Sequence, residues 1–167
     1  MFALTRILVP TNLGEPSRTA IKYGVAFARQ FNAQLYLVHV FGVKELDAAL
    51  ETERVMETLL LDGVPATEPD PEQVAKNAAR EDLAKLLSPE EERDTRAAYL
   101  QRAAPSGAGD AIVACAQELD VELIVMGKHR LGFVDHLFAG SVAERVIRRA
   151  LCPVLVVHHP EHDFIQT

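Results

Sequence analysis

The chain has 167 residues, a length typical of one domain, and 49% of them are hydrophobic, which is enough to build a substantial core. Trp is absent, aromatic residues make up only 6%, and the formal net charge is −7; both features argue against nucleic-acid binding, which needs stacking surface and basic charge. The two cysteines lack metal-ligand spacing, and we find no apolar run long enough for a signal peptide or a membrane span. We therefore expect a single cytoplasmic domain over residues 1–167, with no metal site and no membrane association.

The first elements along the chain alternate between strand and helix. Residues 6–11 form a short run rich in β-branched side chains, apolar on both faces, which predicts a buried strand of a parallel sheet. Residues 15–32 repeat apolar side chains at helical spacing, with Pro16 where a first turn tolerates it, and predict a helix. Residues 33–40 repeat the strand pattern.

The middle of the chain is acidic. Residues 44–94 contain 15 acidic and 6 basic side chains, and we expect a helical crossover over about residues 45–92. Two amphipathic helices, at 45–61 and 71–87, should flank an acidic turn rich in proline at 62–73. A solvated connection between strands is the main interpretation, and a partner-binding lid is the alternative. Residues 95–103 have more polar positions and predict a strand at the sheet edge.

The last third again alternates. Residues 109–120 predict a helix, while 121–127 and 153–158 predict buried strands. Ser141, with Glu144 three residues later, forms a capping box and predicts a helix start. Helix starts also bind phosphates, and Gly140 would let a ligand approach closely, although capping alone would explain the pair. Residues 159–167 form a polar tail. The strand and helix order predicts an α/β domain with a parallel sheet and helices on both faces.

Asn12 and Gly127 lie at the carboxyl ends of two predicted strands. Asn12 comes after the first strand, and Gly127 ends the strand at 121–127. In doubly wound sheets, ligands bind at the carboxyl ends of the strands where the strand order reverses. If these two strands flank that reversal, Asn12, Gly127 and Gly140 converge on one crevice.

The segments "RILVPTNLGEPSRTAIKYGVAFA" and "ELIVMGKHRLGFVDHLFAGSVAERVIRRALCPVLVV" resemble the universal stress protein family over nearly the whole chain apart from the acidic middle. The resemblance implies a five-stranded, mostly parallel Rossmann-like sheet of the adenine nucleotide alpha hydrolase type. It also implies binding of ATP, AMP or a related adenine nucleotide, which Mg²⁺ could accompany, and a homodimer built through the last strand, 153–158. On this basis we expect one universal stress protein domain that acts as a regulatory or binding protein in stress response.

Carried over to this sequence, the family motif implies a nucleotide site formed by Pro10, Thr11, Asn12, Val40, Met126, Gly127, His129, Arg130, Gly140, Ser141 and Val142. Two of these positions depart from the motif. Arg130 replaces the second glycine of Gly-x-x-Gly, and Asn12 replaces the usual aspartate. The Arg130 side chain could fill the pocket, or it could donate two hydrogen bonds to a phosphate.

Two alternatives therefore stay open. The first is an interaction protein without nucleotide, whose site is filled by Arg130. The second is a slow ATPase, although we identify no catalytic residues in the sequence. His129, Asp135 and His136 show no arrangement typical of a hydrolase, and His158, His159 and His162 are expected to belong to a polar extension and not to a metal site.

Overall fold

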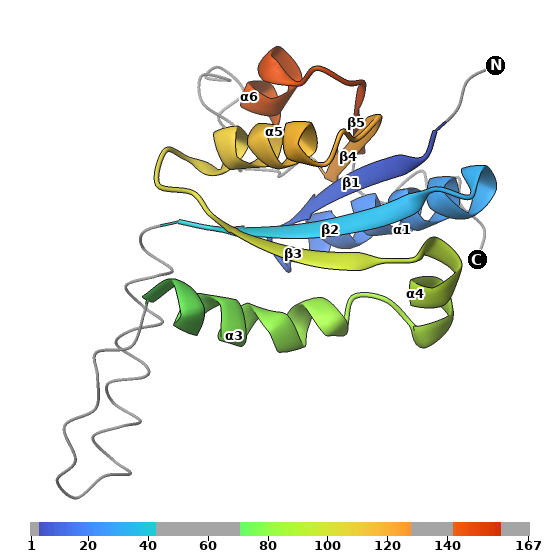
Figure 1. Ribbon diagram of the computed structural model, residues 1–167, viewed down its shortest axis with the longest axis horizontal. Coiled ribbons are helices and arrows are strands. Elements are labelled where there is room, and N and C mark those ends of the chain that lie inside the picture. The colour runs from blue at the N-terminus through green and yellow to red at the C-terminus, as the bar shows by residue number, and fades with distance from the viewer. Residues whose placement is uncertain (1–3, 43–70, 128–141, 158–167) are drawn as a thin grey trace, which may run out of the picture.

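The computed structural model describes residues 4–42, 71–127 and 142–157. Its strands are β1 (Arg6–Thr11), β2 (Gln34–Phe41), β3 (Ala98–Ala103), β4 (Leu123–Gly127) and β5 (Val154–Val157). They form one five-stranded sheet in the order β3-β2-β1-β4-β5, with every neighbouring pair parallel (Figure 1). The predicted fold class is confirmed, including the place of the third strand at an edge of the sheet.

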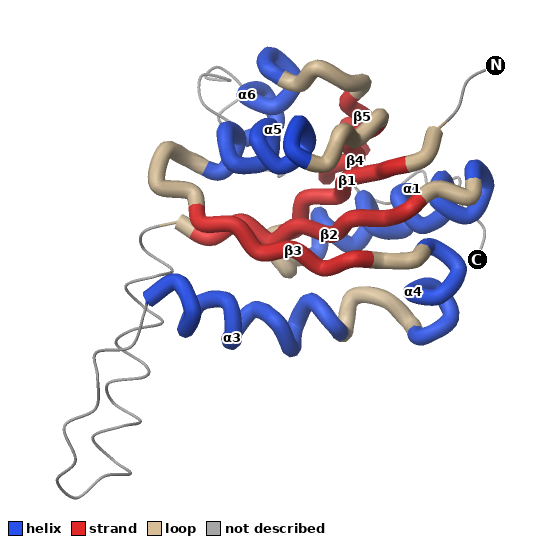
Figure 2. The backbone as a smooth tube through the Cα atoms, in the orientation of Figure 1, coloured by secondary structure: helices blue, strands red, loops and turns tan. Residues whose placement is uncertain are grey.

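The helices cover both faces of this sheet (Figure 2). The helices α1 (Glu15–Phe31), α3 (Pro71–Ala84) and α4 (Pro89–Thr95) lie on one face, and α5 (Ala108–Glu118) and α6 (Val142–Arg149) lie on the other. Right-handed crossovers produce this division, because the chain moves outward from β1 to β3 and then returns past β1 to β4 and β5. The strand order therefore reverses between β1 and β4.

Side chains of each strand alternate between two hydrophobic cores. Ile7 and Val9 pack on the α1 face, whereas Leu8 packs on the face covered by α5 and α6. The same alternation in β2, β4 and β5 explains why these strands are apolar at successive positions. The sequence pattern thus reports burial on both faces, as expected for the inner strands of a parallel sheet.

Helix α1 packs very closely on the sheet. Of its five apolar positions at helical spacing, Ala20, Ile21, Val25 and Ala28 are buried, and Phe27 is half-buried against the same core. At Gly24, a Cβ atom would lie 2.5 Å from Cγ2 of Val9 and 3.2 Å from Cδ1 of Leu35, so α1 can approach the sheet only because this position has no side chain. The helix ends at Asn32, whose left-handed backbone returns the chain toward β2.

Helix α4 is absent from the sequence-based prediction. It begins with a capping box, in which Ser88 accepts a hydrogen bond from the Glu91 amide and the Glu91 carboxylate accepts one from the Ser88 amide. Thr95, expected to begin the edge strand, instead ends this helix, and its hydroxyl donates to the Glu91 carbonyl. The edge strand β3 therefore begins at Ala98 and not at Thr95. Helix α3, which was predicted to extend to residue 87, ends at Ala84.

Three other predicted segments lie outside the described residues: the helix at 45–61, most of the acidic turn at 62–73, and the tail at 159–167. None of the described helices is long and apolar enough to cross a membrane.

Candidate functional site at the carboxyl ends of β1 and β4

The pairing of β1 with β4, here called the β1–β4 seam, is short. Its ladder consists of Ile7 with Leu123 and Leu8 with Ile124, whereas β1 pairs with β2 along its whole length from Arg6 to Thr11. The ladder therefore ends at Leu8 and Ile124, three residues before the carboxyl end of each strand. This is also the point where the strand order reverses, which is the usual ligand site of such sheets.

Pro10 explains why the ladder stops. Successive residues of a parallel strand direct their backbone groups alternately to the two neighbouring strands. The Arg6 carbonyl accepts from the Glu122 amide at 3.0 Å, on the β4 side, and the Thr5 carbonyl accepts from Gln34 at 2.8 Å, on the β2 side. Pro10 therefore faces β4, and it has no N–H group to continue the ladder. One residue of β1 thus ends the ladder of hydrogen bonds between β1 and β4.

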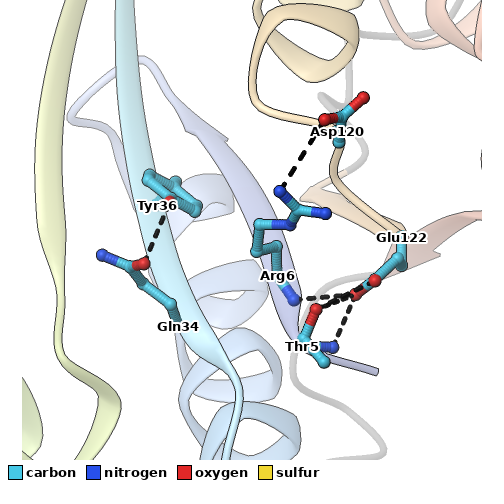
Figure 3. A network of polar contacts seen from close by, with 6 residues as sticks. All are labelled: Thr5, Arg6, Gln34, Tyr36, Asp120 and Glu122. Carbon is cyan, nitrogen blue, oxygen red and sulfur yellow. Dashed lines mark hydrogen bonds and ion pairs between the residues drawn. The ribbon is translucent and has the colours of Figure 1, made fainter. Parts of the chain in front are cut away.

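A polar network holds the opposite, amino end of the seam together (Figure 3). The Glu122 carboxylate accepts hydrogen bonds from the amides of Thr5 and Arg6, at 2.5 and 2.9 Å, and from the Thr5 hydroxyl at 2.9 Å. Arg6 also lies 3.8 Å from the Asp120 carboxylate. Desolvation would raise the pKa of Glu122, but these hydrogen bonds outweigh it and hold the pKa below its usual value.

The loop after β1 is fixed by its own side chains. The Thr11 hydroxyl accepts from the Leu13 amide at 3.0 Å, and Leu13 adopts a left-handed backbone with φ of 64°. The side-chain oxygen of Asn12 accepts from the Gly14 amide at 3.1 Å and from the Ser17 hydroxyl at 2.6 Å. This loop therefore leads into α1 in one defined conformation.

His39 is a member of this site that the sequence analysis missed. Its Nδ1 lies 3.0 Å from the Thr11 carbonyl, and because a carbonyl only accepts, Nδ1 donates in this contact. The ring is buried and lies 6.4 Å from the Phe41 ring, measured between centroids. A histidine within an otherwise apolar strand was the signal available in the sequence, since a buried polar side chain requires a partner. His39 ties the end of β1 to β2.

Apolar side chains at the carboxyl ends of these strands point toward α5 and α6. Val40 and Met126 belong to the core on that face, and alternation along β1 directs Pro10 to the same side. Pro10 and Met126 are buried, whereas Val40 is half-buried. The side chains of Val40, Pro10 and Met126 therefore form an apolar layer at the carboxyl ends of β2, β1 and β4, beside the polar loop at Asn12.

Helix α6 is held in place by a close contact with α5. A Cβ atom at Gly109 would lie 2.8 Å from Cβ of Arg145 and 3.4 Å from the Val142 carbonyl. Asp110 accepts from Nε and Nη2 of Arg145 at 2.9 and 2.6 Å and from Arg149 at 3.1 Å. The hydrogen bond from Arg145 holds the pKa of Asp110 below its usual value. The position of Val142, the first residue of α6, depends on these contacts.

Of the site residues expected from the sequence, the structure places six on three neighbouring strand ends and the loop after β1: Pro10, Thr11, Asn12, Val40, Met126 and Gly127. Val142 begins α6, with 42% of its surface exposed. The remaining four, His129, Arg130, Gly140 and Ser141, lie outside the described residues. In the part of the chain that the structure describes, no group of three His, Cys, Asp or Glu side chains is arranged to hold a metal ion.

Comparison with known proteins gives consistent matches. A model of the universal stress protein family matches residues 3–158. A universal stress protein of Methanocaldococcus jannaschii is 29% identical over 159 residues, which cover 95% of this chain and 84% of that protein.

Solved structures of universal stress proteins share the fold. One, in complex with cAMP, has a TM-score of 0.58 and 20% identity, and the match covers 94% of this chain and 98% of the other. Another, from Archaeoglobus fulgidus in complex with dAMP, has a TM-score of 0.53 and 21% identity, with 93% and 98% coverage.

Proposed function

The chain belongs to the universal stress protein family, and we propose that it binds an adenine nucleotide such as ATP or AMP at the carboxyl ends of β1 and β4. It would act in stress response as a dimeric regulatory or binding protein. The observation that carries the proposal is the β1–β4 seam, whose ladder ends at Leu8 and Ile124 where the strand order reverses. Nucleotides bind at this point in sheets of this kind.

The chemistry of the described residues suits such a ligand. The half-buried Val40 offers an apolar surface to a base, while the loop at Asn12 offers polar groups to a sugar. Helix α6 starts at Val142, and the unpaired N–H groups of a helix start attract phosphate. The structures of relatives in complex with cAMP and dAMP support an adenine nucleotide as the ligand class.

A charge placed at Val142 tests the site directly. Val142→Glu puts a carboxylate in the first turn of α6, where it favours the helix but repels a phosphate. We expect AMP and ATP affinity, measured by calorimetry, to fall about tenfold or more, corresponding to about 1.4 kcal/mol. The neutral Val142→Gln variant is the matched control and should stay within about twofold of the unaltered protein. Equal affinities for all three proteins would place the phosphates elsewhere.

Native mass spectrometry of the purified protein tests the proposal without substitution. A co-purifying mass equal to an adenine nucleotide is the expected result. If no nucleotide co-purifies and calorimetry detects no binding at millimolar ATP, the proposal fails. Release of phosphate from ATP in the presence of Mg²⁺, measured above a heat-treated control, would add the slow ATPase activity considered from the sequence.

Arg130 distinguishes nucleotide binding from the alternative of an interaction protein that has lost its ligand. If the side chain of Arg130 fills the site, Arg130→Gly should create or strengthen AMP binding. If Arg130 instead contacts phosphate, the same change should weaken binding. Arg130→Lys is the control for charge alone, because it keeps the positive charge but loses the bidentate geometry.

The dimer proposed through the last strand is supported by the surface around β5. This strand ends the described sheet order, and its residues Val154, Leu155 and Val156 are only half-buried. Nearby, Ile147 is 54% exposed and Leu151 is 86% exposed. An apolar strand at a sheet edge, beside exposed apolar side chains, favours pairing with another chain.

A further inference from the structure

The side-chain amide of Asn12 has one fixed orientation. Its oxygen accepts from the Gly14 amide at 3.1 Å and from the Ser17 hydroxyl at 2.6 Å. A backbone N–H group can only donate, so the atom facing Gly14 must be the oxygen and not the nitrogen of the carboxamide. Ser17 strengthens the arrangement, because it is buried and its hydroxyl also accepts a hydrogen bond from the backbone N–H of Asn12 at 3.1 Å.

Gly14 makes room for this arrangement. A Cβ atom at Gly14 would lie 3.2 Å from the Asn12 side-chain oxygen, which is tighter than an ordinary contact, so a glycine lets the carboxamide lie against the loop backbone. The side-chain oxygen of Asn12 thus accepts two hydrogen bonds from within the loop. The only acceptor atom of the Asn12 carboxamide is therefore already in use.

The group that Asn12 has left for a ligand is therefore its NH₂. Asn12 is exposed at the carboxyl end of β1, and within residues 4–42, 71–127 and 142–157 no group accepts a hydrogen bond from its Nδ2. An aspartate in the same position would make the same two contacts with one oxygen and present its second oxygen outward. The outward atom would then accept hydrogen bonds, whereas in this chain it donates them.

Building on the nucleotide site proposed above, we propose that Asn12 determines ligand specificity by donating an Nδ2 hydrogen to an acceptor atom of the bound nucleotide. The preferred ligand presents an acceptor toward Asn12, such as a keto oxygen, an unprotonated ring nitrogen or a sugar oxygen. A ligand that offers only a donor hydrogen at this point leaves two N–H groups facing another donor, and it binds more weakly.

Asn12→Asp replaces the outward-facing hydrogen-bond donor of Asn12 by an acceptor oxygen, with little change in the shape of the side chain. The carboxylate keeps the hydrogen bonds from Gly14 and Ser17, and its charge is favourable close to the start of α1. We therefore expect the variant to fold as stably as the unaltered chain, which circular dichroism during thermal unfolding checks.

Four nucleotides of similar charge serve as probes: AMP, IMP, 2′-fluoro-2′-deoxy-AMP and 3′-fluoro-3′-deoxy-AMP. IMP carries a keto oxygen in place of the 6-amino group, and the fluorinated analogues lack a hydroxyl hydrogen but keep a weak acceptor. Affinities are compared as the ratio of each analogue to AMP, because the added negative charge of the variant weakens all four equally. We expect at least one ratio to differ about tenfold between the two proteins, with the unaltered protein favouring whichever ligand presents an acceptor to Asn12 and Asn12→Asp favouring the one that presents a donor.

Ser17→Ala provides a second test of the same idea. Without the Ser17 hydroxyl, the carboxamide is held by Gly14 alone, so the selectivity ratio should move toward one while AMP still binds. If all ratios are the same in the unaltered protein and in Asn12→Asp, Asn12 does not contact the ligand and the inference is wrong, although the nucleotide site stands. If the unaltered protein binds none of the four probes, the site itself is wrong and the inference falls with it.

Discussion

Replacing Gly109 by alanine tests how the start of α6 is held. In the structure, the added Cβ atom would lie 2.8 Å from Cβ and 2.9 Å from Cγ of Arg145, and 3.4 Å from the Val142 carbonyl. Real Cβ atoms essentially never come within 3.0 Å of such neighbours. Because the Cβ of Arg145 is fixed to the α6 backbone, rotation of the arginine side chain cannot relieve the clash. Helix α6 must therefore move away from α5.

The expected cost follows from two opposing effects. Overpacking at a tight contact destabilises a protein by about 1–3 kcal/mol. Alanine in place of glycine stabilises a helix by about 0.5–1 kcal/mol. We therefore expect Gly109→Ala to lower the free energy of unfolding by about 1–2 kcal/mol, and Tm by about 2–8 °C for a chain of this size.

Urea unfolding and AMP calorimetry measure the two consequences separately. The urea midpoint should fall while the m-value stays constant, and AMP affinity should fall because the phosphate-binding end of α6 is displaced. Gly24→Ala is the matched control, since its Cβ would lie 2.5 Å from Val9 on the opposite face of the sheet. It should lower stability without changing AMP affinity.

Two results would refute this reasoning. If Gly109→Ala is as stable as the unaltered protein or more so, α6 moves freely and the contact with α5 does not position it. If Gly24→Ala loses as much AMP affinity as Gly109→Ala, affinity follows overall stability and not the place of α6.

Three further predictions concern other parts of the molecule. Glu122→Gln should cost about 1 kcal/mol at pH 7, because charge-assisted hydrogen bonds to Thr5 and Arg6 are weakened. Since the pKa of Glu122 is lowered on folding, this stability is complete above its unfolded pKa of about 4.3 and is lost as the pH falls through the folded value. Urea unfolding of both proteins should therefore converge toward pH 2, and a constant difference would contradict the assignment. Ser88→Ala should cost about 1 kcal/mol through loss of the α4 cap, with the exposed Ser106→Ala unchanged in the same urea assay; equal midpoints would show that the cap does not stabilise the fold. Leu151→Glu should shift sedimentation from dimer to monomer without loss of stability, because this side chain is 86% exposed, and an unchanged sedimentation coefficient would exclude Leu151 from the interface.

The strands were predictable because burial on both faces requires apolar residues at successive positions, and such runs are visible in the sequence. The runs at 6–11 and 33–40 coincide with β1 and β2 to within a residue or so. The order of the strands in the sheet could not be predicted in this way, since any two apolar strands have the same pattern. The reversal between β1 and β4 became visible only in the structure. Helix α4 was predictable from Ser88 and Glu91, but its acidic residues were interpreted as part of a solvated crossover.

The candidate site shows a similar division. The positions of Thr11, Asn12 and Gly127 at strand ends follow from the sequence pattern, because each directly follows or ends an apolar run. The orientation of the Asn12 carboxamide does not follow, because it depends on Ser17, five residues away along the chain in the first turn of α1. The role of His39 depends on the register that places it opposite Thr11, and a single strand considered by itself does not contain that register.

The short β1–β4 seam also divides the sheet into two unequal parts. On one side, β3, β2 and β1 are joined by six-residue ladders, and on the other β4 and β5 are joined by a four-residue ladder. Two residue pairs form the backbone ladder between the parts, and the Glu122 network, the packing of α1 across Val125 and the core that joins Leu8 to Ile124 on the other face add side-chain contacts. Local unfolding should therefore begin at the seam, and amide hydrogen exchange in β4 should be faster than in β2. A ligand bound across both strand ends would slow exchange in β4 selectively, so that the exchange rate of the β4 amides would report whether the site is occupied.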